Sequence, residues 1–279
     1  MSGVRIVTDN GCDLPDALIE KLGIVVVPLD VRLGPHSAEE MRNVAPARFW
    51  ELAKSEQAIA ETSAPSPGSF AAAYEDALSD GCSGVVCVTL SSGLSATYQS
   101  AVAGAASAPV GFPVVVVDSQ LATVGEGLAV LEALELADSG APAAAMGSAL
   151  ETALNSIEVF GTLDTLEWLR RGGRIGAAQA LVGSLLSIKP VIEVRGGVVE
   201  PESRQRTRTR SLEYVAEKVR AAVPLKRLAI AHAAAADVGE MQRLLAPIFP
   251  ANETIVSYIG PIIGAHTGPG TIGVALQRA

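Results

Sequence analysis

The fold is decided by residues 85–100, VVCVTLSSGLSATYQS, where an apolar run leads directly into a turn of small polar residues. Residues 114–117, VVVV, form a second apolar run, and residues 94–106 between the two runs are helical in character. Continuous apolar runs of this length are typical of strands that are covered on both faces in a parallel sheet. The stretch therefore predicts a strand, a turn, a helix and a second strand parallel to the first.

The same alternation extends over the first 150 residues. Asp13 is predicted to cap a helix over residues 15–22, which Gly23 ends. Further strands are expected at residues 4–8 and 24–33, and further helices at residues 46–56, 67–79, 121–137 and 142–154. Alternating strands and helices predict a doubly wound α/β domain over residues 1–155.

After Ser156 the pattern changes, because residues 190–194 and 198–201 flank Arg195, Gly196 and Gly197 in the manner of a β-hairpin. Strands are expected at residues 159–163, 228–231, 254–259 and 272–276, and helices at residues 165–171, 177–186, 212–223 and 238–245. A hairpin within strand and helix alternation predicts a second α/β domain with a mixed sheet over residues 156–279.

Composition limits the class of protein. Hydrophobic residues make up 49% of the 279 residues and charged residues 18%, which excludes a disordered chain. The formal net charge of −9 disfavours unspecific binding to nucleic acid or to an anionic membrane. No apolar run is long enough for a stable membrane anchor, and no secretory signal is visible, so we expect a cytoplasmic protein.

Common catalytic and metal-binding signatures are missing from the sequence. It has no GxSxG, HExxH or GxxxxGK[ST] motif, and its three cysteines lack metal-ligand spacing. Gly268, Gly270 and Gly273 spell GxGxxG, but too few residues follow for the helix that a dinucleotide site requires. We expect neither a metal site nor a cofactor.

Small polar turns at the ends of apolar runs are the candidate binding elements. Ser91 and Ser92 follow the strand at residues 85–90, and helix-start amides with nearby hydroxyls suit a carboxylate or phosphate, although an ordinary helix cap is an alternative. In the turn at residues 170–176, arginines flank two glycines and can reach an anion, or simply favour a helix end. His266 lies among glycines and a proline, where it is unlikely to fill a core.

In this order, the turns resemble the DegV family of bacterial fatty-acid-binding proteins, which includes the acyl carriers of the fatty acid kinase system. The resemblance runs nearly from end to end. It covers IVTD at residues 6–9, TSAPSPG at 62–68, SSGLSATYQS at 91–100, DTLEWLRRGGRI at 164–175, KP at 189–190 and GAHTGPG at 264–270. Asn10, Ala64 and Ala96 depart from the more usual Ser, Gln and Gly.

The resemblance implies a two-domain α/β protein that encloses one long-chain fatty acid, such as palmitate, in an apolar tunnel. It implies that Thr62 and one serine of the Ser91 and Ser92 pair, with Ser92 preferred, bind the carboxylate, with Ser63 and His266 close by. Arg171 and Arg174 would lie near the head group. The protein would be a carrier without catalytic residues of its own, presenting the acyl carboxylate to a separate fatty acid kinase that supplies ATP and metal.

Arg204, Arg206, Arg208 and Arg210 form the one basic cluster of this acidic sequence. If the first three are extended, their spacing puts them on one face, which suits docking of an acidic kinase surface. The alternative is a strand edge that its charges protect.

Rival functions remain open at this point. One is an enzyme, either a lipid hydrolase that uses Ser92 with His266, or a small-molecule kinase, since the family fold resembles a domain of dihydroxyacetone kinase. The other is a lipid-dependent regulator or storage protein, which needs no kinase partner.

Overall fold

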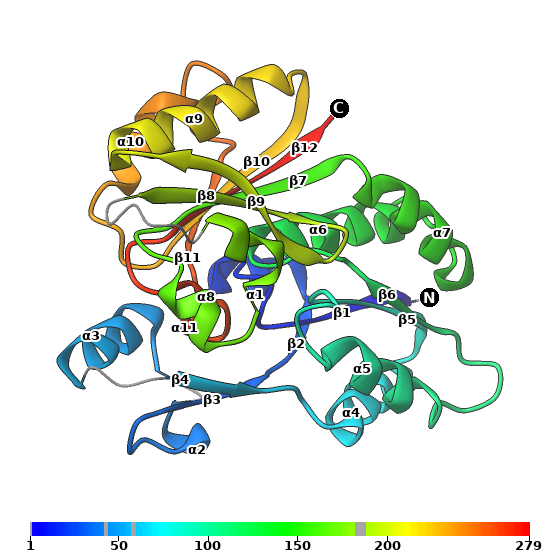
Figure 1. Cartoon of the computed structure of the whole chain (residues 1–279). Helices are drawn as coiled ribbons and strands as arrows, with labels where there is room; N and C mark the ends of the chain where they lie inside the picture. The colour runs from blue at the N-terminus through cyan, green and yellow to red at the C-terminus, as the bar shows by residue number, and fades with distance from the viewer. Residues whose placement is uncertain (1, 42–43, 57–59, 182–187) are drawn as a thin grey trace.

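The computed structural model describes residues 2–41, 44–56, 60–181 and 188–279. It contains a four-stranded sheet with strand order β2-β1-β5-β6, a six-stranded sheet with order β11-β10-β12-β7-β8-β9, and a small ribbon of β3 and β4 (Figure 1). The first sheet is parallel throughout, and the second is mixed. The predicted fold class is confirmed.

The parallel sheet is covered on both faces, as its apolar strands predicted. Its strands are β1 (Ser2–Asp9), β2 (Val25–Val27), β5 (Cys82–Thr89) and β6 (Val114–Asp118). In β5, Val85 packs toward α4 (Pro67–Ser79) and α5 (Thr97–Ala105). Val86 packs on the opposite face, toward α6 (Val124–Asp138) and α7 (Ala143–Leu154). The helix α1 (Asp16–Leu22) lies between β1 and β2 in the chain.

One face of the mixed sheet packs against two helices that face solvent, and the other face packs against α6. Its strands are β7 (Ile157–Thr162), β8 (Lys189–Arg195), β9 (Val198–Gln205), β10 (Leu225–His232), β11 (Ile255–Tyr258) and β12 (Ile272–Arg278). The helices α9 (Arg208–Ala221) and α10 (Val238–Leu245) cover the outer face (Figure 1). β8 and β9 form the predicted hairpin, in which Gly196 and Gly197 both have positive φ.

Every strand of the parallel sheet precedes residue 119, and every strand of the mixed sheet follows residue 156. We therefore keep residue 155 as the proposed end of the first domain. The helix α6 packs against both sheets, since Leu128 shares one core with Val86 of β5 and Val159 of β7. The inner face of the mixed sheet is thus turned toward the first half of the chain.

Several predicted elements differ in the structure, and the helices expected at residues 121–137 and 212–223 are Val124–Asp138 and Arg208–Ala221. The strand expected at residues 24–33 is two strands, because Pro28 lacks the N–H that would continue the ladder, and β3 (Asp30–Leu33) leaves to pair with β4 (Ala60–Ser63). The helix expected at residues 94–106 begins only at Thr97. The helix expected at residues 177–186 is a 3₁₀ helix, η1 (Gly176–Leu181), and its remainder lies outside the described residues.

The prediction that Asp13 caps α1 is wrong. Pro15 precedes the helix, whose first turn has no side-chain cap. Asp13 has φ +49, and its carboxylate instead accepts hydrogen bonds from the Thr123 hydroxyl and the Gly260 N–H. Asp13 therefore ties the start of α6 to the start of α11 (Pro261–Thr267), a helix where the sequence predicted only a turn.

The remaining short helices are α2 (Ala38–Met41), α3 (Pro46–Glu56) and α8 (Glu167–Arg171). The helix α3 packs on α11 through Trp50, whose indole N–H donates to the Ile259 carbonyl at 3.2 Å. A Cβ on Gly264 would come within 2.4 Å of the Trp50 ring, so glycine is required at this contact. The result is a fixed position for α11 beside β4.

Candidate functional site

A cavity of about 180 Å³ lies where α11 and β4 meet the inner face of the mixed sheet. An engineered apolar cavity of ~150 Å³ is large enough to bind benzene. The wall of the cavity in this protein is mostly aliphatic. Its apolar lining residues are Leu29, Ala64, Leu90, Leu94, Ala96, Ala122, Val159, Phe160, Leu163, Leu169, Ile192, Val194, Val199, Ile259, Ile262 and Ile263. The cavity therefore suits an apolar ligand.

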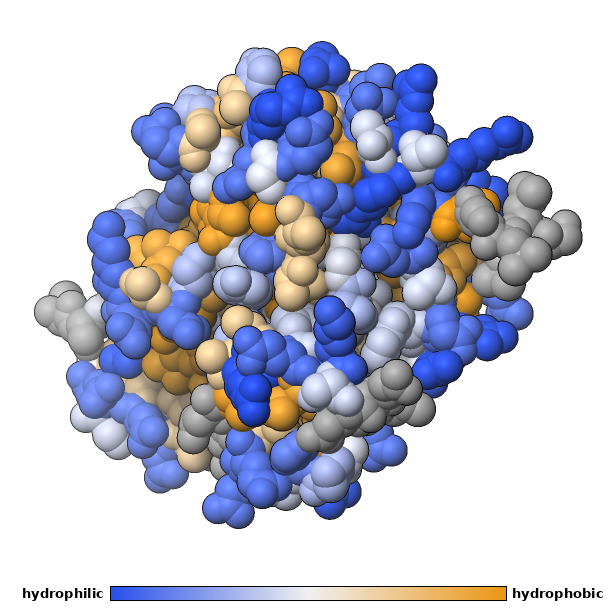
Figure 2. Space-filling model, turned by 90° about the vertical axis from the view of Figure 1, so that its left-hand side faces the viewer, coloured by the Kyte–Doolittle hydropathy of each residue, from blue (hydrophilic) through white to orange (hydrophobic). Residues whose placement is uncertain are grey.

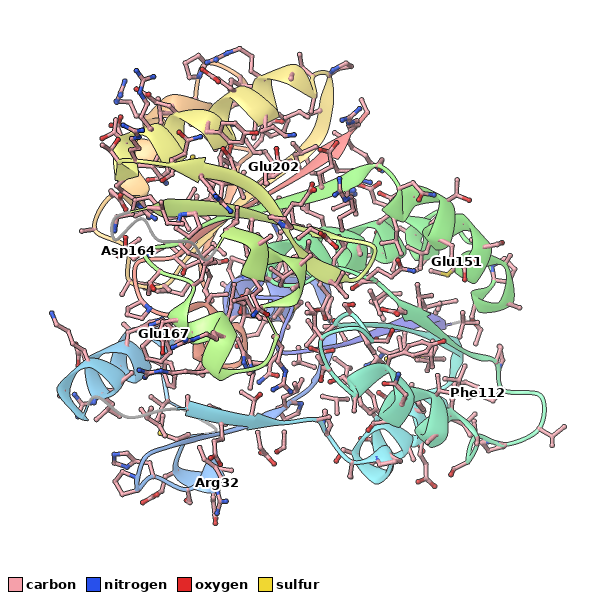
Figure 3. The ribbon with its side chains drawn as sticks, in the orientation of Figure 1. Arg32, Phe112, Glu151, Asp164, Glu167 and Glu202 are labelled. Atoms are coloured by element: carbon pink, nitrogen blue, oxygen red, sulfur yellow. The ribbon has the colours of Figure 1, made fainter. Side chains whose placement is uncertain are left out.

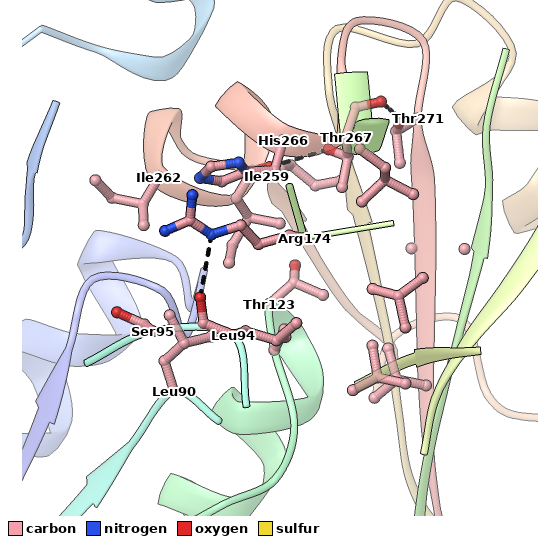
Figure 4. A pocket seen from close by; sticks show the side chains of 18 of the residues that line it. Leu90, Leu94, Ser95, Thr123, Arg174, Ile259, Ile262, His266, Thr267 and Thr271 are labelled. Atoms are coloured by element: carbon pink, nitrogen blue, oxygen red, sulfur yellow. Dashed lines mark hydrogen bonds between the residues drawn. The ribbon is translucent and has the colours of Figure 1, made fainter. Parts of the chain in front are cut away.

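Thr62 and His266 both line the cavity and form what we call its polar end. Figure 4 shows His266 beside Arg174. Thr62 Oγ1 and His266 Nε2 are 3.0 Å apart, at hydrogen-bond distance, although 204 positions separate them in the sequence. β4 supplies the threonine and the last turn of α11 supplies the histidine. The structure thus brings together two residues that the sequence analysis had grouped.

His266 is largely buried, and the burial lowers the pKa of its imidazole to about 4, with a smaller effect from the nearby charge of Arg174. The ring is therefore neutral near pH 7 in the empty protein. Its Nδ1 is buried and has no hydrogen-bond partner. A Cβ on Gly172 would come within 2.2 Å of this nitrogen, so the glycine-rich turn lies directly against the ring.

Arg174 is the only lining residue of the cavity with a permanent positive charge, among the residues that the structure describes. Its guanidinium donates to the Gly172 carbonyl at 2.7 Å and, from Nε, to the Leu94 carbonyl at 3.4 Å. Figure 4 shows it between His266 and Leu94, so it joins a loop of the second half to a loop of the first. Arg174 therefore lies beside His266, and its place near the head group of a ligand stays a prediction.

The serine turn after β5 has a different geometry from the predicted one. Ser91 is fully buried, and its hydroxyl donates to the Gly197 carbonyl at 2.7 Å. The Ser92 N–H donates to Asp118, and neither serine is among the described lining residues. Ser95 lines the cavity instead, and its Oγ accepts the Thr97 N–H at the start of α5.

Ser91 and Ser92 therefore lie outside the described cavity lining, and carboxylate binding by either serine stays a prediction. That prediction assumed a helix start at Leu94, which would direct the amides after Ser91 and Ser92 to a ligand. The helix α5 begins at Thr97 with Ala96 as its N-cap residue and no side-chain cap, while Ser95 Oγ accepts the Thr97 N–H and Ser95 lines the cavity. The side chain of Ser95 thus bonds the backbone two residues further on, as serine commonly does in turns.

Ser63 and Arg171 do not reach the cavity. Ser63 follows Thr62 in β4, so their side chains point to opposite faces, and Ser63 is exposed. Arg171 pairs with Glu167 of α8 at 2.8 Å, and Figure 3 shows Glu167 on the surface near α3. Arg171 lines a separate open groove with Trp168 and Lys54. On the face that Figure 2 shows, hydrophobic residues gather along the middle, with hydrophilic ones above and below.

The proposed docking arginines do not share one extended face. β9 ends at Gln205, and Arg208 is the first residue of α9. Its guanidinium pairs with Asp237 at 2.7 Å and donates to the Gly270 carbonyl, so it is held inward. Arg204 is exposed and donates to the Ala180 carbonyl, and Arg206 is exposed. The geometric condition for a three-arginine surface is therefore not met.

Nothing in the geometry favours the predicted hydrolase. A serine nucleophile needs a base at hydrogen-bond distance, and His266 Nε2 is paired with Thr62 while Ser92 lies outside the cavity lining. Within the described ranges no three His, Cys, Asp or Glu side chains are grouped to hold a metal ion. A search of the same ranges finds no helix with the length and hydrophobicity needed to cross a membrane.

These features define a class of α/β protein in which a parallel and a mixed sheet enclose an apolar cavity with one polar end. A family model described as uncharacterised protein, DegV family, matches residues 3–279, and the chain belongs to this family. A DegV domain-containing protein of Streptomyces coelicolor is 37% identical over 279 residues, covering 98% of each chain.

Solved structures agree with this assignment. A DegV family protein from Thermus thermophilus, described by its fatty acid binding, is 36% identical with a TM-score of 0.87, and 99% of each chain is covered. DegV of Bacillus subtilis, described as a fatty acid binding protein, is 29% identical with a TM-score of 0.85, again over 99% of each chain. The resemblance seen in the ordered turns is confirmed.

Proposed function

We propose that this protein binds one long-chain fatty acid, with the acyl chain in the cavity and the carboxylate at the end formed by Thr62 and His266. The observation that carries the proposal is the apolar cavity whose wall includes this hydrogen-bonded pair. The fatty acid binding described for the similar proteins of Thermus thermophilus and Bacillus subtilis supports it.

The energetics are compatible with useful affinity. Burying a chain of about 16 carbons gains about 12 kcal/mol at ~0.8 kcal/mol per methylene. The loss of freedom on association costs about 4 to 15 kcal/mol. The balance is close, so the carboxylate must not add a further penalty, and an ionised carboxylate out of water requires hydrogen-bond donors.

Four groups of the cavity wall can meet that need. The Thr62 hydroxyl, the Ser95 hydroxyl and Arg174 are donors, and a bound carboxylate would raise the low pKa of His266 toward a protonated, donating ring. Thr97 helps Ser95, because its N–H donates to Ser95 Oγ and the two hydroxyls are 2.8 Å apart. When the Thr97 hydroxyl is the donor of this pair, the Ser95 proton is free for the ligand carboxylate.

The proposed role is that of a cytoplasmic carrier that presents the acyl carboxylate to a separate fatty acid kinase. On this proposal the kinase supplies ATP and metal, and the carrier supplies only the bound acyl chain. Family membership supports it, and the exposed Arg204 and Arg206 remain the candidate docking residues. Charge reversal at Arg206 would weaken kinase-dependent turnover and leave lipid binding unchanged.

The direct test is to denature the purified protein and identify the released lipid by mass spectrometry. We expect a long-chain fatty acid. Thr62→Val removes one hydrogen bond to a charged group and should weaken hexadecanoate binding about 10-fold. Thr209→Val, on the exposed side of α9, is the matched control and should bind as the wild type. Folded protein that carries no fatty acid and binds none when offered would overturn the proposal.

A further inference from the structure

The floor of the cavity is bare backbone at one place. Gly161 of β7 and Gly273 of β12 are direct cross-strand partners, and both line the cavity. The same row of the sheet continues to Ala231 of β10 on one side and to Ile192 of β8 on the other. Across four neighbouring strands, the row therefore presents a methyl group, two positions without a side chain, and one large side chain.

The fold does not require glycine at position 273. Its φ lies outside the left-handed region that favours glycine. A Cβ built there meets Thr123 Cγ2 at 3.6 Å and the Ala231 carbonyl oxygen at 3.9 Å, which are ordinary contacts. Glycine inside a strand costs stability relative to alanine and often marks a close approach by a ligand. The space above Gly273 is therefore left open by the sequence rather than filled by the protein.

Gly161 is more constrained, because a Cβ there would lie 3.2 Å from Ile192 Cγ1. Packing against Ile192 thus accounts for part of the need for glycine at 161. The contrast makes Gly273 the cleaner probe, since a methyl group at this position enters the cavity without displacing a neighbour.

The adjacent row of the sheet closes the trough. Val159 of β7 pairs with Ala275 of β12 and with Val194 of β8, and both valines line the cavity. The helix α6 packs closely against Val159, since a Cβ on Gly125 of α6 would come within 2.1 Å of Val159 Cγ2. The two glycines therefore form a shallow trough beside a wall that α6 keeps in place.

We propose that the trough formed by Gly161 and Gly273 holds the apolar end of the acyl chain, and that the missing side chain at 273 sets the longest chain that is accepted. This inference rests on the proposed fatty acid binding and adds its chain-length specificity. A methyl group in the trough removes room for the last methylenes, while shorter chains keep all their contacts.

The test compares affinities for dodecanoate and octadecanoate in the wild type and in Gly273→Ala. We expect the preference for octadecanoate over dodecanoate to fall about 10-fold, the loss of about two buried methylenes. Dodecanoate binding should stay within about 2-fold of the wild type, because on this proposal only the longer chain reaches the trough. The ratio is measured on one preparation, so any unfolded fraction cancels.

Gly3→Ala is the matched control, since Gly3 lies in β1 with nothing within 4 Å of a built Cβ. It should leave the length preference unchanged. Equal weakening for both chains, or no change, in Gly273→Ala would overturn the inference while fatty acid binding stands. A wild type that binds neither chain would overturn the proposed function itself.

Discussion

Two buried polar regions lie at opposite ends of α11, and they are built differently. At its start, the Asp13 carboxylate accepts the Gly260 N–H at 2.8 Å, close to the buried Asp9 and Glu126. At its end, His266 contacts Thr62 beside the cavity. One short helix therefore connects a cluster of buried carboxylates with the proposed carboxylate-binding end.

The acidic cluster is bonded mainly to the protein itself. Asp9 accepts the N–H groups of Leu90 at 2.9 Å and Gly11 at 2.8 Å, and Glu126 accepts the Thr8 hydroxyl at 3.1 Å. Burial raises the pKa of Asp9 to about 6 and that of Asp13 to about 7, and it raises that of Glu126 well above its usual range. Burial and the neighbouring charge of Asp9 thus both favour the protonated form of Glu126.

Each region has one buried atom without a partner, Glu126 Oε2 in the cluster and His266 Nδ1 at the cavity. Only His266 is part of the cavity wall. Burial and a shifted pKa therefore do not by themselves identify a binding site. Open volume next to the polar group distinguishes the cavity wall at His266 from the acidic cluster.

The substitution that should change stability most removes Asp9 from the acidic cluster. Asp9→Ala leaves the buried Leu90 and Gly11 N–H groups without an acceptor. We expect a loss of about 3 kcal/mol in the free energy of unfolding, since breaking a buried hydrogen-bonded group on one side leaves its partners unpaired. Urea denaturation followed by circular dichroism measures it.

Asp9→Asn is the control, because it keeps one oxygen acceptor and removes the charge. It should cost clearly less than Asp9→Ala. If the alanine variant unfolds at the same urea concentration as the wild type, the cluster does not hold the two halves of the parallel sheet together as the contacts indicate.

The second prediction concerns how the free energy of unfolding depends on pH. An aspartate with a raised pKa binds more protons in the folded than in the unfolded state, so stability grows as the pH falls. For Asp13 the gain begins near its folded pKa of about 7 and is complete below its ordinary value of 3.8. Between about pH 7.5 and 5.5 we expect Asp13 to contribute about 2 kcal/mol of added stability.

Asp13→Asn removes this titration, so its stability should rise less than that of the wild type over the same range. His266 acts in the opposite direction, because its pKa is lowered to about 4, but it does so in both proteins. The difference between the two pH curves therefore reports the titration of Asp13 together with its electrostatic effect on the neighbouring Asp9. Parallel curves would show that Asp13 is ionised throughout, against the geometry of its closed site.

Elements whose pattern is local could be predicted from the sequence. Residues 85–90 and 114–117 are apolar throughout because both faces of a central parallel strand are buried, so their strands were recognisable. The pattern of β4, AETS, is not apolar, and its strand exists only because β3 pairs with it. A strand such as β4 depends on pairing with its partner and cannot be predicted from its own residues.

The contacts at the candidate site could not be predicted for the same reason, because they join residues far apart in the sequence. Thr62 and His266 were grouped by family resemblance, whereas their 3.0 Å contact joins residues 204 positions apart. Asp13 was expected as a helix cap, because its hydrogen-bond partner Gly260 lies 247 positions away. The partner of Asp9 at Leu90 likewise lies 81 positions away. Long-range partners decide what a carboxylate does, and no local pattern contains them.

The smallest expected effect separates the serine that the sequence favoured from the one that the structure places on the wall. Ser95→Ala removes one of several donors to the ligand carboxylate and should weaken hexadecanoate binding about 5-fold, or ~1 kcal/mol. Ser92→Ala should change the affinity by less than about 2-fold, since Ser92 uses its backbone N–H, which alanine keeps, to bind Asp118. Isothermal titration calorimetry measures both. The reverse order, with Ser92 the more important, would mean that the turn rearranges when the ligand binds, and that the cavity wall of the empty protein does not define the head-group site.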